Sequence, residues 1–298
     1  MKKLLCTLVI LTAVITPGLV ALELELAGGL GNLAFDHDRT SALSESGVEG
    51  TFSPNYFPLA LVRLSGEYRG FSCNAGFERD PLERNRLFAN IRADLDYFFI
   101  EAGPFIGLFN SRALPLNPGI SAALGLMVPG IFFVQAAGSS TLGTVMDLTG
   151  RYFQNSGSIS AGFWVPYVIC SLNMSVKDFT IREEANLLIT DQLTRYFFKA
   201  DVYTKNVPYT IQVDIGYQSL QRSYQSERVD GTALVKDTIT DEFKSLFAGL
   251  EGTYTLNPAL KLLLGAEMPV YSWGVRPMKD PSRGTFFFQA KAGVIVSF

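Results

Sequence analysis

The segment TFFFQAKAGVIVSF, residues 285–298, alternates between two kinds of position along its whole length. Its odd-numbered positions are mixed and partly polar, whereas its even-numbered positions are all apolar: Phe286, Phe288, Ala290, Ala292, Val294, Val296 and Phe298. Successive side chains of a strand point to opposite faces, so this segment is predicted to be a β-strand with one unbroken apolar face. It ends on an aromatic residue, whereas the ends of a domain are usually frayed and polar.

This ending resembles the C-terminal assembly signal of outer-membrane β-barrels of diderm bacteria. In that family a terminal Phe, preceded by apolar residues at every second position, marks the last strand for insertion. Phe298, Val296 and Val294 occupy those positions here. The resemblance implies a porin-like barrel in the cell outer membrane, with outer-membrane lipid and the barrel-assembly machinery as its partners. It points to no particular family.

The first residues of the chain have the pattern of an export signal. Lys2 and Lys3 are basic, residues 4–15 are apolar, and Pro17-Gly18 interrupts the run shortly before Ala21. This predicts a signal peptide over residues 1–21. A membrane anchor is the alternative, because the apolar run is nearly long enough to span a bilayer, but the proline–glycine break favours cleavage. A single barrel domain is then expected over residues 22–298.

The two-residue period recurs along the rest of the chain in segments of about ten residues, the length that a tilted strand needs to cross a bilayer. Fourteen such strands are predicted, at 22–33, 57–66, 71–79, 86–97, 100–109, 119–128, 131–141, 157–165, 167–180, 191–204, 208–221, 241–255, 259–272 and 285–298. The fold class predicted is therefore all-β: a transmembrane antiparallel up-and-down β-barrel. The pattern is weakest over residues 45–78, so a barrel of twelve strands is the alternative.

The connections between these segments fall into two classes. Short connections contain proline or glycine, which mark turns because proline cannot occupy the interior of a closed ladder; they lie near residues 129–130, 166, 206–208 and 257–258. Longer polar connections are predicted at 182–190, 221–239 and 272–284. Short turns on one side and longer loops on the other are typical of outer-membrane barrels, whose turns face the periplasm.

Charged residues recur on the parity that is not apolar. If the apolar parity faces lipid, the other faces the lumen, where water or an opposite charge can solvate them. The residues expected there are Arg92, Asp94, Asp96, Lys177, Arg195, Lys199, Asp201, Asp214, Lys261, Glu267 and Lys291. A barrel of about fourteen strands is too wide for side chains to fill. The sequence therefore predicts a passive pore for small polar solutes, and no strong ion selectivity because both signs of charge are present.

Two other functions stay open at this point. The lumen could be closed by its own ion pairs, so that the protein acts through its external loops as an adhesin or a surface receptor. A transporter of hydrophobic substrates, similar to the fatty-acid-channel family, is the other alternative. Members of that family carry a plug before their first strand, whereas strand character here starts at Leu22, directly after the predicted signal peptide.

Several further classes are disfavoured by composition and motifs. The formal net charge of -3 and the lack of a basic stretch argue against nucleic-acid binding. An exported soluble β-protein would have to bury a long apolar face on every strand. Cys73 and Cys170 lie within strand-like segments, where a free cysteine serves as a small apolar residue, although a disulfide is allowed.

No enzyme is predicted. The single histidine, His37, lies between two aspartates in a polar stretch, and no nucleophile or zinc-ligand set accompanies it. The glycine-rich run at 28–31 falls within the first strand with no helix after it, which does not fit a phosphate-binding loop. No catalytic residue, cofactor or metal is therefore expected.

Overall fold

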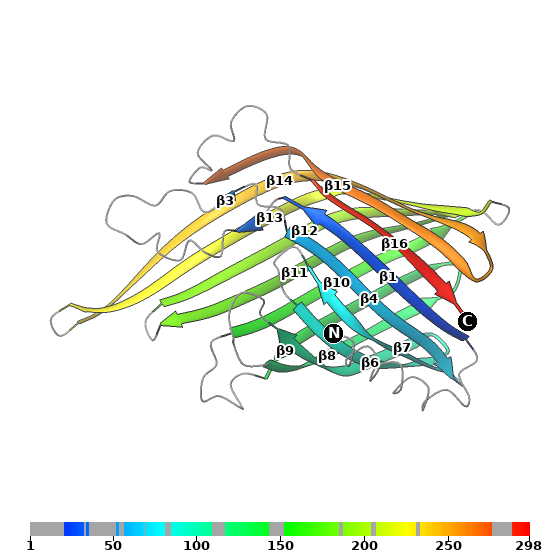
Figure 1. Ribbon diagram of the computed structural model, residues 1–298, viewed down its shortest axis with the longest axis horizontal. Helices are drawn as coiled ribbons and strands as arrows, with labels where there is room; N and C mark the ends of the chain where they lie inside the picture. Colours follow the sequence, from blue (N-terminus) through cyan, green and yellow to red (C-terminus); the bar gives the residue numbers. More distant parts are fainter. Residues whose placement is uncertain are drawn as a thin grey trace.

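Fourteen antiparallel strands form a closed barrel in the computed structural model (Figure 1). The model describes residues 21–32, 34–35, 52–53, 57–68, 70–80, 85–108, 117–142, 152–184, 187–203, 207–230, 233–275 and 288–298. The predicted fold class and strand number are thereby confirmed, and the alternative of twelve strands is wrong. The predicted signal peptide lies outside the described residues except for Ala21, where the first strand begins.

The barrel strands follow one another in chain order around the wall, and each pairs with both of its neighbours. They are β1 (Ala21–Gly31), β4 (Phe57–Tyr68), β5 (Phe71–Arg79), β6 (Asn85–Leu95), β7 (Phe98–Leu108), β8 (Asn117–Val128), β9 (Phe132–Thr141), β10 (Tyr152–Val165), β11 (Val168–Glu184), β12 (Leu187–Tyr203), β13 (Tyr209–Asp230), β14 (Ala233–Asn257), β15 (Leu260–Val275) and β16 (Gln289–Ser297). A separate pair of short strands, β2 (Ala34–Phe35) and β3 (Phe52–Ser53), belongs to the connection between β1 and β4.

The barrel closes where its last strand meets its first. β16 pairs with β1 from Glu23 opposite Ser297 to Gly31 opposite Gln289. The apolar parity of the C-terminal segment continues across this seam, because Leu26 lies opposite Val294. Where all fourteen strands are paired, closure leaves no strand edge with free backbone groups, which is the condition for a sheet to exist in hydrocarbon.

The two ends of the barrel differ in their connections. Six connections lie at the end that also holds the start of β1 and Phe298, whose backbone N–H donates to the carbonyl of Leu22 at 2.8 Å. We call this the turn end. The connection between β8 and β9 shows why it can be short: Gly130 has φ of 75°, a conformation that glycine adopts without strain. The opposite end, where β1 leads towards β4 and β15 leads towards β16, is called the loop end.

Two of the predicted loops are strands instead. Residues 182–190 and 221–239 were expected to be long polar connections, but β11 and β12 continue to Glu184 and from Leu187, and β13 and β14 are paired out to Asp230 and Ala233. The hydrophobic alternation stops before the backbone ladder does, because polar residues take the outward positions of β13 beyond Tyr217. Hydrogen-bonded pairs such as Ser223 with Thr240 replace the apolar face there.

The outward face of the barrel is a band of exposed apolar side chains. Its middle contains large aliphatic residues such as Leu172, which is 69% exposed. Towards the turn end the band finishes in exposed aromatic residues, among them Tyr97, Tyr167, Tyr209 and Tyr254. Towards the loop end it finishes in a cluster of rings 5.6–6.3 Å apart, formed by Tyr196, Tyr217, Tyr271 and Trp273. Aromatic girdles at both edges of an apolar band are the pattern of a barrel immersed in a bilayer.

Beyond the loop-end girdle the outward face turns polar. Ser219 donates to Glu242, and Glu242 forms an ion pair with Lys244 at 2.8 Å. From Tyr209 to Tyr217 the band spans eight residues of one strand, or about 26 Å at about 3.3 Å per residue. A tilt of about 40° reduces this to about 20 Å, close to the height of the apolar band of outer-membrane barrels. Within the described ranges, no helix is long and apolar enough to cross a membrane.

The two cysteines of these strands are free. Cys73 lies on β5 and Cys170 on β11, and the register places both on the outward parity beside apolar neighbours. They act as small apolar residues of the exterior, as expected from their positions in the sequence.

A charge in the middle of the band is expected to destabilise the barrel. Leu172→Arg should lower the free energy of unfolding in lipid vesicles by about 2–4 kcal/mol, because an outward arginine at mid-depth loses its water to hydrocarbon. Thr180→Arg is the matched control: it lies on the same face of β11, beyond the polar Asp178, and should cost about 0–1 kcal/mol. Equally small losses for both variants in a urea titration would contradict the assignment of this band to hydrocarbon.

Candidate functional site

The inward face of the barrel carries most of the charged residues of the strands. The register of the ladder puts ten of the eleven side chains expected in the lumen on the inward parity: Arg92, Asp94, Lys177, Arg195, Lys199, Asp201, Asp214, Lys261, Glu267 and Lys291. Asp96 differs, because it lies in the turn between β6 and β7 with φ of 41° and is exposed at the turn end. It therefore belongs to the rim and not to the wall.

These inward charges neutralise one another locally. Lys291 pairs with Glu251, and Arg195 pairs with Glu267 while its guanidinium lies 4.1 Å from the centre of the Phe247 ring. Shorter-range pairs along the wall are Arg63 with Glu25 at 3.2 Å, Lys199 with Asp201 at 3.5 Å, Arg92 with Asp94 at 2.6 Å and Lys261 with Glu23 at 3.8 Å. Asp214 accepts a hydrogen bond from Gln212 at 2.9 Å. The wall is therefore strongly polar but nearly neutral at each level.

One set of ion pairs crosses the lumen. Lys177 Nζ, on β11, lies 3.2 Å from Asp80 Oδ2 and 3.7 Å from Glu78 Oε1, at the end of β5. Glu78 in turn pairs with Arg86 on β6 at 3.0 Å, and Arg86 donates to Ser139 of β9 at 3.4 Å. β5 and β11 are separated by five strands on one side of the ring and seven on the other. We call Arg86, Glu78, Lys177 and Asp80 the ion row.

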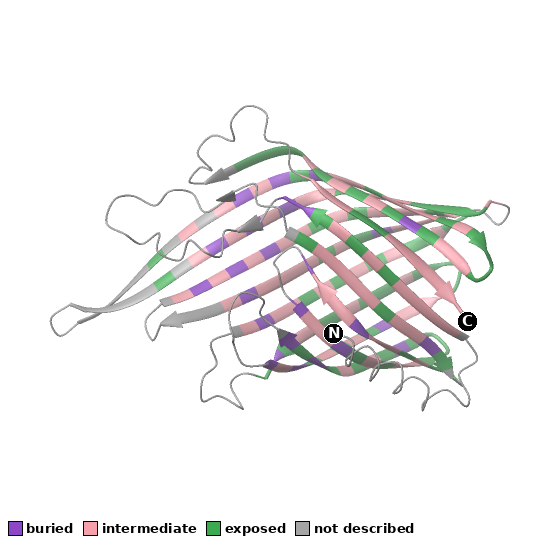
Figure 2. Cartoon of the chain, in the orientation of Figure 1, coloured by how far each residue is buried: buried purple, intermediate pink, exposed green. Residues whose placement is uncertain are grey.

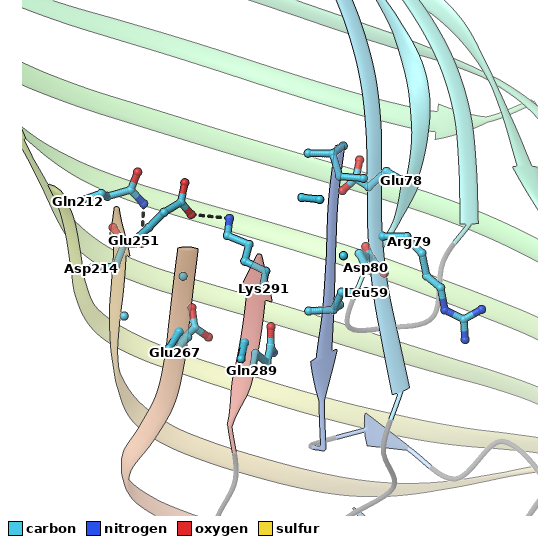
Figure 3. Close-up of a pocket in the computed structure, with 18 of the residues that line it drawn as sticks. Leu59, Glu78, Arg79, Asp80, Gln212, Asp214, Glu251, Glu267, Gln289 and Lys291 are labelled. Carbon is cyan, nitrogen blue, oxygen red and sulfur yellow. Dashed lines mark hydrogen bonds and ion pairs between the residues drawn. The ribbon is translucent and has the colours of Figure 1, made fainter. Parts of the chain in front are cut away.

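The ion row divides the lumen into two lobes. The larger, which we call the charged lobe, is a cavity of about 340 Å³ that includes the wall of β12–β16, β1 and β4. Figure 3 shows the side chains of this lobe, with Glu251 and Lys291 facing each other on one side and Glu78 and Asp80 on the other. The smaller, about 270 Å³, lies against β6–β11 and is lined by Asn90, Ser121, Ser139, Ser156, Ser158 and Ser175. We call it the serine lobe; Lys177 borders both cavities.

On β12–β14, solvent access to the inward face falls from the turn end to the loop end. On β12, Asp201 and Lys199 are partly exposed near the turn end, whereas Asp191 near the loop end is 1% exposed. The same end is buried on β11 and β14, where Phe179 and Phe243 lie near the loop end (Figure 2). Along these strands the lumen is thus most open at the turn end and narrows towards the loop end.

On the side of the serine lobe, the closing layer is polar. The Gln154 amide, on β10, donates to the backbone carbonyl of Asn85 on β6 at 3.2 Å, and its backbone N–H donates to Thr141 at 3.2 Å. Asn117 is buried at the same level. Three strands separate β10 from β6, so this contact also reaches across the lumen.

On the other side the closing layer contains a buried ion pair. Arg222 donates to both carboxylate oxygens of Asp191, at 2.6 and 2.7 Å, and both side chains are 1% exposed. The inward side chains around it on β11–β14 are apolar, including Leu193, Leu220 and Phe243. A bidentate, fully desolvated pair of this kind has a fixed geometry, so it holds β12 and β13 in register beyond the apolar band.

Several residues of the lumen were missed by the reading of the sequence. Glu251 lies on a strand that was predicted, and the parity of that strand would have placed it inside. Asp80 directly follows the predicted strand 71–79 and Arg86 begins the predicted strand 86–97, whereas Asp191 and Arg222 lie where strands were expected to end. Their partners follow from the curvature and closure of the barrel, which no local pattern encodes.

One residue was considered for catalysis from the sequence. His37 lies outside the described residues. Among the described residues, no group of three or more His, Cys, Asp or Glu side chains is arranged to hold a metal ion.

Comparisons with known proteins give fold likenesses only. No protein-family model matches this sequence, and no curated protein matches it. A bacterial polysaccharide outer membrane secretin aligns with 9% identity and a TM-score of 0.47, covering 93% of this chain and 97% of its own. An outer membrane channel from Pseudomonas putida F1 aligns with 8% identity and a TM-score of 0.45, covering 95% and 96%. A loop-deletion mutant of OmpT of Vibrio cholerae aligns with 8% identity and a TM-score of 0.43. The alignment covers 94% of this chain and 99% of the OmpT chain.

Scores at this level carry no functional argument. The closed barrel itself confirms the expectation of a porin-like antiparallel β-barrel at the level of the fold, and no family is identified.

The buried pair at the loop end gives a test of this layer. Arg222→Met should lower the free energy of unfolding by about 3–5 kcal/mol, because it leaves Asp191 as a buried charge without its guanidinium partner. The double variant Asp191→Leu with Arg222→Met should recover most of that loss, since neither charge then remains. Arg63→Met, which breaks a partly exposed pair, is the control and should cost about 0–1 kcal/mol. Urea unfolding in lipid vesicles measures all three, and a neutral Arg222→Met would contradict the burial of the pair.

Proposed function

We propose that this protein is an outer-membrane β-barrel whose polar lumen passes small polar solutes passively. The main support is the contrast in polarity between the two faces of the barrel wall. The outward face is an exposed apolar band with aromatic edges, and the inward face is a wall of paired charges around solvent-accessible cavities of about 340 and 270 Å³. A soluble protein could not leave such a band in water, and a barrel without a passage has no need of a wide hydrated interior.

The location rests on the same observation together with the ends of the sequence. The apolar band fits a bilayer, and the export pattern of residues 1–21 with the apolar parity ending in Phe298 fits delivery to the outer membrane. In that setting the turn end faces the periplasm and the loop end faces the outside. Outer-membrane lipid surrounds the band, and the barrel-assembly machinery inserts it.

The charge pattern sets what kind of solute the lumen suits. Ions and dipoles both find partners along the wall, so a small polar solute can exchange its hydration for protein contacts. Because the wall charges are matched in pairs, no one sign of ion is favoured. The same charges disfavour a hydrophobic substrate, which would have to displace the water that solvates them.

The ion row and the closing layer are the barriers along this path. Lys177 and its partners cross the lumen directly beside the layer around Gln154 and Asn85, which spans it near the loop end. This layer also favours a second candidate, a barrel that acts through its loop end as an adhesin or receptor while its lumen stays closed.

Conductance separates the two candidates. The purified protein in a planar lipid bilayer should give discrete current steps. Lys177→Ser should enlarge the steps about two-fold, because this change removes the cation that crosses the lumen and so widens one of the two barriers along the path. Lys199→Ser is the control, since Lys199 pairs with Asp201 of its own strand and crosses nothing.

The pore would be contradicted if neither the wild type nor Lys177→Ser gave current steps. Gel mobility that changes on heating would show that both proteins are still folded barrels, and the second candidate, a closed barrel, would then be supported.

A further inference from the structure

We propose that the serine lobe is a binding site for small, uncharged solutes that carry several hydroxyl groups, such as sugar alcohols or monosaccharides. The inference rests on the proposed function, and it names the solute class for one of the two lobes. It follows from which hydrogen-bonding groups line that lobe and which of them are already used.

The lobe is lined by neutral hydroxyl and amide groups from adjacent strands. Ser139 and Ser156 share a hydrogen bond of 2.7 Å across β9 and β10, and Ser121 donates to Asn90 at 2.7 Å. Ser158 of β10 lies directly opposite Ser175 of β11. Among the described residues, neither of these two hydroxyls has a side-chain partner, so both can donate to and accept from a solute.

The charged groups at the edge of the lobe are already bonded. Glu101 accepts hydrogen bonds from Asn90 at 2.9 Å and from Asn74 at 3.4 Å. Arg86 and Lys177 are bonded within the ion row. An anion that moved into the lobe would lose hydration, meet the Glu101 carboxylate, and find Arg86 and Lys177 already paired with acids, which is unfavourable. A solute with hydroxyl groups exchanges hydrogen bonds with water for equivalent bonds with serine and asparagine.

The size and the surroundings of the lobe fit a small solute. Its volume of about 270 Å³ lies just below the range of about 300–1,000 Å³ that is usual for small-molecule sites. The charged lobe differs in chemistry, because its wall holds pairs such as Glu251 with Lys291 and Arg195 with Glu267. Lys177 lies between the lobes, so the ion row keeps the neutral surface apart from the charged one.

The test is the affinity of ribitol, a five-carbon sugar alcohol, for the purified barrel in detergent, followed by NMR titration. The double variant Ser158→Ala with Ser175→Ala should weaken binding at least about five-fold, because it removes two hydrogen-bonding groups from the lining of the lobe. Thr210→Ala with Thr253→Ala is the matched control: these threonines also lie opposite each other on adjacent strands, β13 and β14, but on the charged side of the lumen. The control should bind ribitol as the wild type does.

Ribonate, which replaces one terminal hydroxymethyl group of the same carbon chain by a carboxylate, should bind more weakly than ribitol. Ribonate binding as tightly as ribitol would overturn the inference, since it would assign the lobe to anions held by Arg86 and Lys177. No ribitol binding, or equal losses in the serine and threonine variants, would also overturn it. These outcomes can be told apart from the test of the pore. Current steps without ribitol binding would support the pore and contradict the binding site. Ribitol binding without current steps would support the binding site and contradict the pore.

Discussion

Closure of the backbone ladder is the constraint on which the rest of this structure depends. A strand in hydrocarbon has no water to satisfy its N–H and C=O groups, so every strand needs a neighbour on both sides. The pairing of β16 with β1 supplies the last of these contacts. Once the ring is closed, side-chain alternation divides the protein into an outward surface and an inward one, and every residue of a strand is committed to one of them.

The inward surface is organised by the cost of desolvating charge. Its acids and bases lie in pairs, as Arg63 does with Glu25, so water and a partner share the solvation of each group. The ion row uses the same chemistry over a longer distance and joins opposite walls. It splits a wide lumen into two smaller cavities with different linings, one of matched charges and one of serine hydroxyls. Near the loop end, pairs such as Asp191 with Arg222 are fully buried, and the lumen narrows accordingly.

The strand number and the inward parity could be predicted because each strand repeats one local signal. Residues such as Leu172 and Ile215 alternate with polar residues wherever the wall passes through the apolar band, and prolines such as Pro166 and Pro258 mark the turns between strands. The ends of β11–β14 could not be predicted in this way. Beyond the band the outward face turns polar, while the inward face carries buried apolar side chains such as Leu220 and Phe243, so the apolar parity of the band stops although the hydrogen-bonded ladder continues.

The cross-lumen contacts were out of reach for a different reason. Lys177 and Asp80 are 97 residues apart in the chain, and they meet only because the shear and curvature of the closed ring bring β5 and β11 face to face. Asp96 shows the opposite error: its parity pointed into the lumen, but the strand had already turned.

The central claim is that the two faces of each strand meet two solvents, hydrocarbon outside and water inside. Spin labels placed one at a time at residues 170–177 of β11, in a variant whose native cysteines are replaced by serine, test it in lipid vesicles. Collisions with oxygen, which concentrates in hydrocarbon, should peak at the even positions, and collisions with a water-soluble nickel reagent should peak at the odd positions. Both reagents peaking at the same positions, or no two-residue period for either, would contradict it.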